Sequence, residues 1–158
     1  MTNLLILNSQ LIVPSMQYEF GALTPSELPL GNKFLIEAQI ASLKSYDNYY
    51  ITLLPSSMQN SEVFNRVLKQ YKFNIVKIRS AKDISTVVLE ALNSIEDKYS
   101  RVDILFSDTI ISNIPEIMRP DVMSAHLKPN HDHWYGTPAD EKFVFSGFSS
   151  FKNVASLT

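Results

Sequence analysis

The segment LPLGNKFLIEAQIASL, residues 28–43, joins a turn to a helix and sets the organisation of the chain around it. Pro29 and Gly31 are typical of a turn that ends one element and begins the next. From Lys33 to about Tyr46 the apolar residues recur at helical spacing, at Leu35, Ile36, Ile40 and Leu43. The segment therefore predicts a turn followed by an amphipathic helix, a junction common between the strands of an α/β protein.

Strands and helices alternate on both sides of this segment. Apolar runs predict strands at NLLILN (3–8), YYITLLP (49–55), NIVKIR (74–79) and RVDILFSD (101–108). Helical spacing predicts helices over 33–46, over 61–73 and, after a capping box formed by Ser80 and Asp83, up to about residue 98. Strand-like composition returns at 121–128 and 142–151. The order predicts a three-layer αβα fold with a mostly parallel sheet of about six or seven strands.

The composition narrows the classes of function. The chain has 158 residues, a hydrophobic fraction of 45%, a formal net charge of -2 and no cysteine. We expect one domain over residues 1–158, either whole or as the N-terminal part of a longer protein. The charge argues against nucleic acid or an anionic membrane as partner, and the lack of cysteine excludes thiolate metal sites. The apolar start has no basic region and is too short to span a bilayer, so we expect a cytoplasmic protein.

Polar residues follow the first and the fourth predicted strands, where α/β sheets bind their ligands. Asn8, Ser9 and Gln10 follow the first strand, and Asp108 ends the fourth. A carboxylate at such a strand end is suited to hold Mg²⁺ against phosphate oxygens, although aspartate also caps turns. The three residues after the first strand fit contacts to a base or sugar, or a polar turn that satisfies its own backbone.

Two other clusters have both a functional and a structural interpretation. His131 and His133 form an H-x-H pair that could share a metal in a strand, but a solvated loop tip is the favoured interpretation. Tyr46, Tyr49 and Tyr50 could stack on a base, but packing beside the following strand is favoured. The sequence holds no G-x-S-x-G, G-x-G-x-x-G or P-loop, which disfavours serine hydrolases, dinucleotide oxidoreductases and P-loop kinases.

Three segments together resemble the sugar nucleotidyltransferases, which join a nucleoside triphosphate to a sugar 1-phosphate or a related phospho-alcohol. The segment 28–43 is similar to the turn and helix that follow the family's catalytic loop. VDILFSDTIIS (102–112) is similar to the strand that ends in Gly-Asp, with Ser107 in place of the glycine, and FVFSGFSSFKNVASL (143–157) is similar to a later strand-to-helix passage. The three matches occur in the family's order. The resemblance implies a nucleotide-diphospho-sugar transferase-like fold, with Mg²⁺ bound by Asp108 and the nucleotide lying over residues 8–10.

The chain departs from this family in the loop after the first strand. No glycine precedes Gly21, and no arginine or lysine occurs in residues 1–32. The family's glycine-rich loop, its arginine and the lysine of its Pro-Lys pair are therefore missing. The family's second metal-binding aspartate lies beyond the passage where this chain ends. Cations and backbone amides are the main catalytic devices of a phosphoryl-transfer site, so these departures bear directly on activity.

Two functions from different classes follow from the resemblance and the departures. The first is a nucleotidyltransferase-like enzyme, or an enzyme-derived domain, of sugar-nucleotide or surface (capsular) polysaccharide metabolism that handles a nucleotide or nucleotide sugar with Mg²⁺. The second is a non-catalytic binding, regulatory or assembly module with a degenerate active site. Either is compatible with a homo-oligomer or an additional domain. A glycosyltransferase of related fold is disfavoured, because SDTIIS (107–112) lacks a D-x-D pair.

Overall fold

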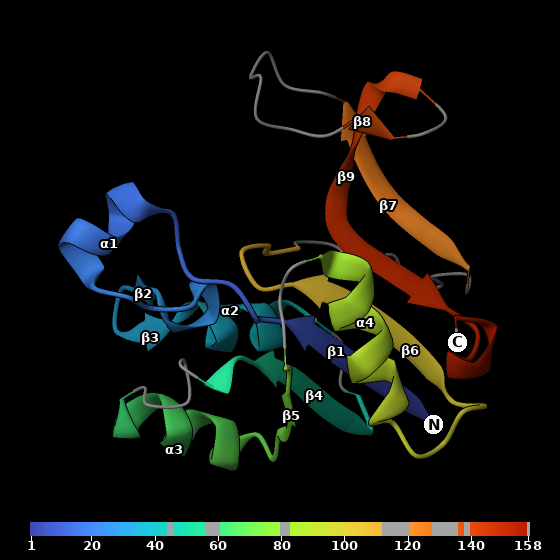
Figure 1. Ribbon diagram of the computed structural model, residues 1–158, viewed down its shortest axis with the longest axis horizontal. Coiled ribbons are helices and arrows are strands. Elements are labelled where there is room, and N and C mark those ends of the chain that lie inside the picture. The colour runs from blue at the N-terminus through green and yellow to red at the C-terminus, as the bar shows by residue number, and fades with distance from the viewer. Residues whose placement is uncertain are drawn as a thin grey trace.

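The computed structural model describes residues 1–43, 46–55, 61–79, 83–111, 121–127, 136–137 and 140–157. Within these residues, seven strands form one mixed sheet in the order β5-β4-β1-β6-β9-β7, with β8 paired to β9 (Figure 1). Four parallel strands make up one part of the sheet: β1 (Thr2–Leu7), β4 (Asn48–Leu53), β5 (Asn74–Lys77) and β6 (Arg101–Phe106). The antiparallel part contains β7 (Val122–Leu127), β8 (Gly136–Thr137) and β9 (Asp140–Phe151).

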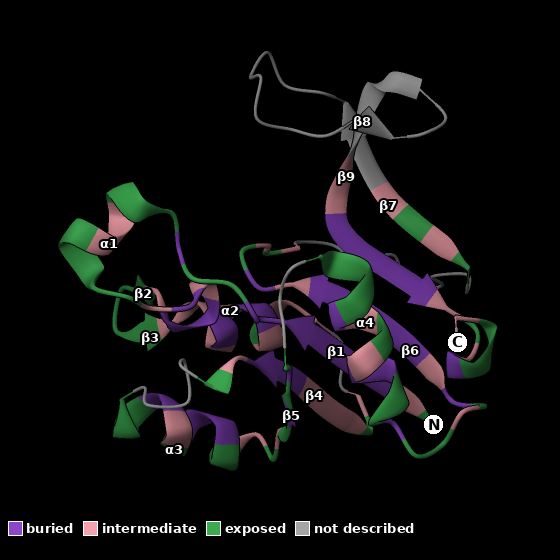
Figure 2. Cartoon of the chain, in the orientation of Figure 1, coloured by how far each residue is buried: buried purple, intermediate pink, exposed green. Residues whose placement is uncertain are grey.

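The central strand β1 is buried on both faces, as its continuous apolar sequence predicts. Leu4 and Ile6 contribute to one hydrophobic cluster, whereas Leu5 and Leu7 contribute to the other. This division follows from the alternation of side chains along a strand. Figure 2 shows the buried residues concentrated in β1, β6 and the part of β9 that pairs with β6. The carboxyl end of β1 is therefore anchored by core packing on both sides of the sheet.

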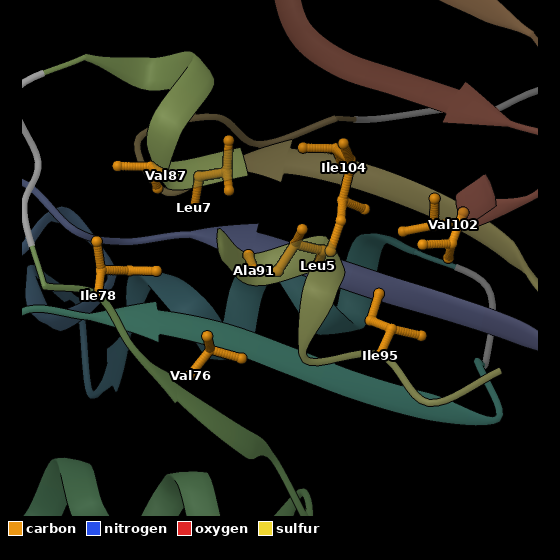
Figure 3. Packing of buried hydrophobic residues seen from close by; sticks show 11 residues of the cluster. Leu5, Leu7, Val76, Ile78, Val87, Ala91, Ile95, Val102 and Ile104 are labelled. Carbon is orange, nitrogen blue, oxygen red and sulfur yellow. The ribbon is translucent and has the colours of Figure 1, made fainter. Parts of the chain in front are cut away.

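Helices cover both faces of the parallel strands. One face carries α4 (Ile84–Asn93), whose Val87 and Ala91 pack over Leu5 and Leu7 (Figure 3). The other face carries α2 (Leu35–Ser42) and α3 (Glu62–Gln70). In α3 the buried residues Phe64, Val67 and Leu68 form the face turned to the sheet. The three-layer αβα fold predicted from the sequence is confirmed, with an antiparallel extension through β9 and β7.

The segment predicted as one irregular loop, residues 9–32, contains regular elements. These are α1 (Pro14–Phe20), the 3-10 turn η1 (Pro25–Glu27) and the start of a small hairpin made by β2 (Pro29–Leu30) and β3 (Lys33–Phe34). The hairpin takes up the beginning of the predicted helix 33–46, so α2 starts only at Leu35. The third predicted helix starts at Ile84, with Asp83 as its N-cap, and Ser80 lies outside the described residues.

The remaining elements are η3 and the antiparallel strands. A second 3-10 turn, η3 (Val154–Ser156), follows β9 and buries Val154 in the cluster beneath α4. The strands β7 and β9 run side by side (Figure 1), and the C-terminal part of β9 pairs with β6. Among the helices in the described ranges, none combines the length and apolar character needed to cross a bilayer.

Candidate functional site

The carboxyl ends of β1 and β6 lie next to each other and carry the residues predicted to form a site. The two strands are parallel neighbours with Leu7 opposite Phe106. The backbone N–H of Ser107 extends this ladder by donating to the carbonyl of Leu7 at 3.2 Å. The two following loops therefore begin side by side, and their strand arrows point toward the part of the molecule that carries α1 (Figure 1). Residues 8–10 and Asp108 are brought to one edge of the sheet, as the topology of the sequence predicted.

Asn8 fastens the loop that follows β1. Its side chain is fully buried; Nδ2 donates to Oγ1 of Thr24 at 2.8 Å, and Oδ1 accepts from the backbone N–H of Ser26 at 3.2 Å. Its own backbone N–H donates to Oγ1 of Thr52 at 2.8 Å. Both ends of the Asn8 amide are thus engaged within the protein. Ser9 is also buried, whereas Gln10 is exposed at the sheet edge.

A buried capping box holds the far end of the same loop. The carboxylate of Glu27 accepts from the backbone N–H of Thr24 at 3.1 Å and from its hydroxyl at 3.0 Å. Farther along, the carboxylate of Glu37 accepts from the backbone N–H of Phe34 at 2.8 Å and caps α2. These bonds engage the side chains of Thr24, Glu27 and Glu37 in local structure. The loop therefore has a defined conformation, and hydrogen bonds fix its ends to β1, β4 and α2.

The middle of the loop is α1, which lies outside the core. None of its residues is buried, and Tyr18 is 92% exposed. The helix stands in the part of the chain where the sugar nucleotidyltransferases have a glycine-rich loop. Because residues 1–32 contain no lysine or arginine, this part of the edge has no cationic side chain to face a phosphate.

Asp108 sits in the turn that follows β6 and is exposed to solvent. The turn closes through the backbone N–H of Thr109, which donates to the carbonyl of Phe106 at 3.1 Å. The Thr109 hydroxyl donates to Oδ1 of Asp108 at 3.1 Å. Asp108 is therefore an exposed carboxylate on a closed turn at the end of a buried strand, which is the placement that the sequence predicted.

Two residues that sequence reasoning did not single out hold this turn in place. Gln39, fully buried in α2, donates through Nε2 to the carbonyls of Phe106, Ser107 and Thr109 at 3.2, 3.1 and 2.8 Å. Gly147 of β9 has φ +83°, and a Cβ built on it would lie 2.2 Å from Oγ1 of Thr109. The helical spacing gave one signal for Gln39, because position 39 follows the buried Ile36 by three residues and shares its face.

The donor set at this edge suits Mg²⁺. Magnesium prefers hard oxygen ligands and is usually bound through one or two carboxylates together with substrate phosphates. Asp108 supplies one such carboxylate. Among the described residues, no three histidine, cysteine, aspartate or glutamate side chains gather into a group that could hold a metal without a ligand. A metal at Asp108 would need further ligands beyond this carboxylate.

Of the two other clusters considered in the sequence, only the tyrosines fall within the described residues, and they do not join this edge. His131 and His133 lie outside the described residues. Tyr46 and Tyr49 pack edge to face with centroids 6.0 Å apart, near the amino end of β4. The Tyr46 hydroxyl donates to Oδ2 of the buried Asp103 at 2.9 Å. Burial, and then the negative charge of Asp103, raise the pKa of Tyr46. The tyrosines therefore belong to the packing, as favoured from the sequence.

Comparison with solved structures places the fold among the nucleotidyltransferases. The CTP:phosphocholine cytidylyltransferase of Streptococcus pneumoniae aligns with a TM-score of 0.59 and 14% identity, covering 96% of this chain and 71% of its own. A nucleoside-diphosphate-sugar pyrophosphorylase of Vibrio cholerae aligns with a TM-score of 0.55 and 14% identity, covering 97% and 73%. A nucleotidyl transferase of Methanothermobacter aligns with a TM-score of 0.53 and 13% identity, covering 69% and 51%.

These likenesses confirm the nucleotide-diphospho-sugar transferase-like fold expected from the sequence. The chain spans about half the length of the Methanothermobacter protein and less than three quarters of the other two. No protein-family model and no curated protein sequence matches the chain.

Proposed function

We propose that this domain binds a nucleotide or nucleotide sugar together with Mg²⁺ at the edge formed by the carboxyl ends of β1 and β6. One observation carries the proposal: Asp108 is an exposed carboxylate on a closed turn beside the loop that follows β1. The fold supports it, because ligands of open α/β sheets bind at the carboxyl ends of the strands.

Each of these residues would have a separate role in binding the ligand. Asp108 would ligate Mg²⁺, which would supply positive charge to neutralise the phosphates of the nucleotide. Gln10, which is exposed, would contact the base or sugar, whereas the side chain of Ser9, the residue before it, is buried. Asn8 would act from below by fixing the loop that presents Gln10, because both ends of its side chain are bonded within the protein.

The favoured function is nucleotidyl transfer in sugar-nucleotide or surface polysaccharide metabolism. Two of the proteins of similar fold carry such names, a cytidylyltransferase and a nucleoside-diphosphate-sugar pyrophosphorylase. The support is the fold together with the resemblance of segments 28–43, 102–112 and 143–157 to the sugar nucleotidyltransferases. On this proposal the missing cations would come from outside the loop after β1.

A specific observation supports a second function, in which the domain is a non-catalytic binding or assembly module of the same fold. The helix α1 stands in place of a glycine-rich loop, and residues 1–32 carry no cationic side chain. Without cations and backbone amides aimed at the phosphates, a transfer site loses much of the electrostatic stabilisation of its transition state. The nucleotide would then be bound without being transferred.

A thermal-shift experiment tests the binding common to both functions. The protein is heated with CTP, UTP, dTTP, GTP or ATP, or with nucleotide sugars, each with Mg²⁺ and with EDTA as the control. A ligand at a hundredfold excess over its Kd stabilises the fold by about 2.7 kcal/mol. We expect a Mg²⁺-dependent shift that Asp108→Ala removes. No shift with any ligand at millimolar concentration would end the proposal.

A pyrophosphate-release assay then separates the two functions. The nucleotide that gives the shift is incubated with Mg²⁺ and a set of sugar 1-phosphates and phospho-alcohols. Release that depends on both substrates and is lost in Asp108→Ala identifies the transferase. Binding without release at any acceptor identifies the non-catalytic module.

A further inference from the structure

We infer that Gln39 is the positioning residue of the proposed metal site, holding the turn that presents Asp108 to the metal. This inference rests on the proposed function, in which Asp108 ligates Mg²⁺. It assigns a role to a residue that lies on a different element from Asp108 and, being fully buried, does not reach solvent itself.

The hydrogen bonds of Gln39 surround Asp108 in the sequence. One side-chain nitrogen, Nε2, faces the carbonyl oxygens of Phe106, Ser107 and Thr109 at 3.2, 3.1 and 2.8 Å. Two of these residues precede Asp108 and one follows it, so the backbone is fixed on both sides. With three carbonyls held by one buried donor, the orientation of the intervening residue is constrained.

A second contact fixes the same turn from the opposite direction in the sequence. Gly147 lies so close to Thr109 that a methyl group at position 147 would meet the Thr109 hydroxyl. That hydroxyl donates to Oδ1 of Asp108 at 3.1 Å. The carboxylate is therefore oriented through Thr109, while Gln39 holds the backbone that carries both residues.

The energetics of Gln39 argue against a role in packing alone. Its Oε1 is buried and, within the described part of the chain, accepts no hydrogen bond. A buried polar atom without a partner costs free energy, so an apolar side chain of similar length would suit the core better. The hydrogen bonds that the Gln39 nitrogen donates to the turn carrying Asp108 explain why an amide occupies this position.

The test compares Gln39→Met, which keeps the length of the side chain and removes the donor, with Asn3→Leu. Asn3 is a matched control, because its buried amide donates to the Ser100 hydroxyl at 2.6 Å and lies at the amino end of β1. The affinity of each protein for Mn²⁺ is measured by water-proton relaxation with CTP, UTP, dTTP, GTP and ATP in turn. Melting temperatures and hydrogen exchange of the Thr109 amide are recorded on the same samples.

We expect Gln39→Met to lower the affinity for Mn²⁺ about 10–100-fold, the range found for residues that orient metal ligands. Its melting temperature should stay at or above that of Asn3→Leu, and exchange of the Thr109 amide should become faster. Asn3→Leu should keep the wild-type affinity. Should Gln39→Met fail to fold, Gln39→Leu, which is shorter and also lacks a donor, gives the same comparison.

Each remaining outcome overturns the inference in a distinguishable way. Wild-type affinity in the Gln39 variants, with binding still lost in Asp108→Ala, would refute the positioning role and leave the proposed function standing. Equal losses of affinity in Asn3→Leu and Gln39→Met would reduce Gln39 to a contributor to stability. Absence of Mn²⁺ binding by the wild-type protein with all five triphosphates would refute the proposed function, and the inference with it.

Discussion

The loops after β1 and β6 start side by side but use their polar residues in opposite ways. After β1, the side chains of Asn8, Thr24 and Glu27 bond to one another and to the loop backbone, and they are buried. After β6, Gln39 of α2 supports the turn from outside, and Asp108 is left exposed. The loop after β1 uses these three side chains for its own structure, whereas the turn after β6 leaves the Asp108 carboxylate exposed to solvent.

This difference separates residues that build a site from residues that can bind a ligand. A side chain whose donors and acceptors are all engaged within the fold contributes shape, and its loss costs stability. An exposed carboxylate on a fixed turn can bind a metal at little cost in reorganisation. The predictions below test this separation, starting with the change expected to have the largest effect on stability.

Gly147→Ala should be the most damaging single change in the described residues of the site. The residue has φ +83°, and its new Cβ would lie 2.2 Å from Oγ1 of Thr109. Backbone strain and overpacking together predict a loss of about 2–5 kcal/mol in the free energy of unfolding, measured by urea denaturation.

Gly31→Ala is the matched control for the cost of backbone strain without a steric clash. Gly31 has φ +64° with no atom within 4 Å of an added Cβ, so its loss should be limited to about 1–2 kcal/mol. Thr109→Ala should recover part of the Gly147→Ala loss by removing the hydroxyl. Equal losses in the free energy of unfolding for Gly147→Ala and Gly31→Ala would show that Gly147 of β9 is not in close contact with the turn that carries Asp108.

Asn8→Ala should cost about 1–3 kcal/mol of stability, because the buried backbone N–H of Ser26 loses its acceptor. Gln17→Ala, which removes one partly buried bond to the carbonyl of Ile12 in the same loop, should cost about 0.5 kcal/mol. Thermal unfolding of both variants checks the difference. An Asn8→Ala protein with wild-type stability and impaired nucleotide binding would instead make Asn8 a ligand contact.

The sequence predicted the central strands because their signal is local. The structure has strands at Thr2–Leu7, Asn48–Leu53 and Arg101–Phe106, where the sequence predicted strands over 3–8, 49–55 and 101–108. Continuous apolar runs of this length identify strands buried on both faces before any contact is known. The placement of Asp108 followed from the same signal, since it depends only on where β6 ends.

The loop after β1 could not be predicted in the same way. The helix α1 buries none of its residues, so it carries no apolar stripe that helical spacing could reveal. The role of Gln39 depends on which residues of β6 lie beside α2, and that is a tertiary contact across 67 or more positions. The helical spacing from Ile36 carried a signal for the buried position of Gln39, but it could not name the partner of this side chain.

Gln10→Ala should affect binding and leave stability unchanged. The residue is exposed, so the free energy of unfolding should change by less than about 0.5 kcal/mol. Loss of one hydrogen bond to a nucleotide predicts an affinity about 3- to 10-fold weaker by calorimetric titration. Gln70→Ala, at an exposed glutamine at the end of α3, is the control and should bind as the wild type does. Unchanged affinity in Gln10→Ala would remove this residue from the site.

The smallest effect concerns pH and a helix away from both loops. Hydrogen bonds from the hydroxyl of Ser85 and from the backbone N–H and hydroxyl of Thr86 lower the pKa of Asp83 to about 2, from 3.8. A carboxylate with a lowered pKa stabilises the folded state above its unfolded pKa and loses this contribution as pH falls through its folded pKa. Asp83→Asn should therefore melt below the wild type at neutral pH, and the gap should close between about pH 4 and pH 2. A gap that persists at pH 2 would contradict this assignment.

The position of the metal tests the central claim most directly. Mn²⁺ added with a nucleotide broadens the NMR amide signals of residues near it. Our account predicts broadening centred on residues 107–109 and on Ser9 and Gln10, with the signals of Tyr99 and Ser100 at the other end of β6 left sharp. Broadening centred on residues 131–133, or spread evenly over the protein, would contradict a metal site at Asp108.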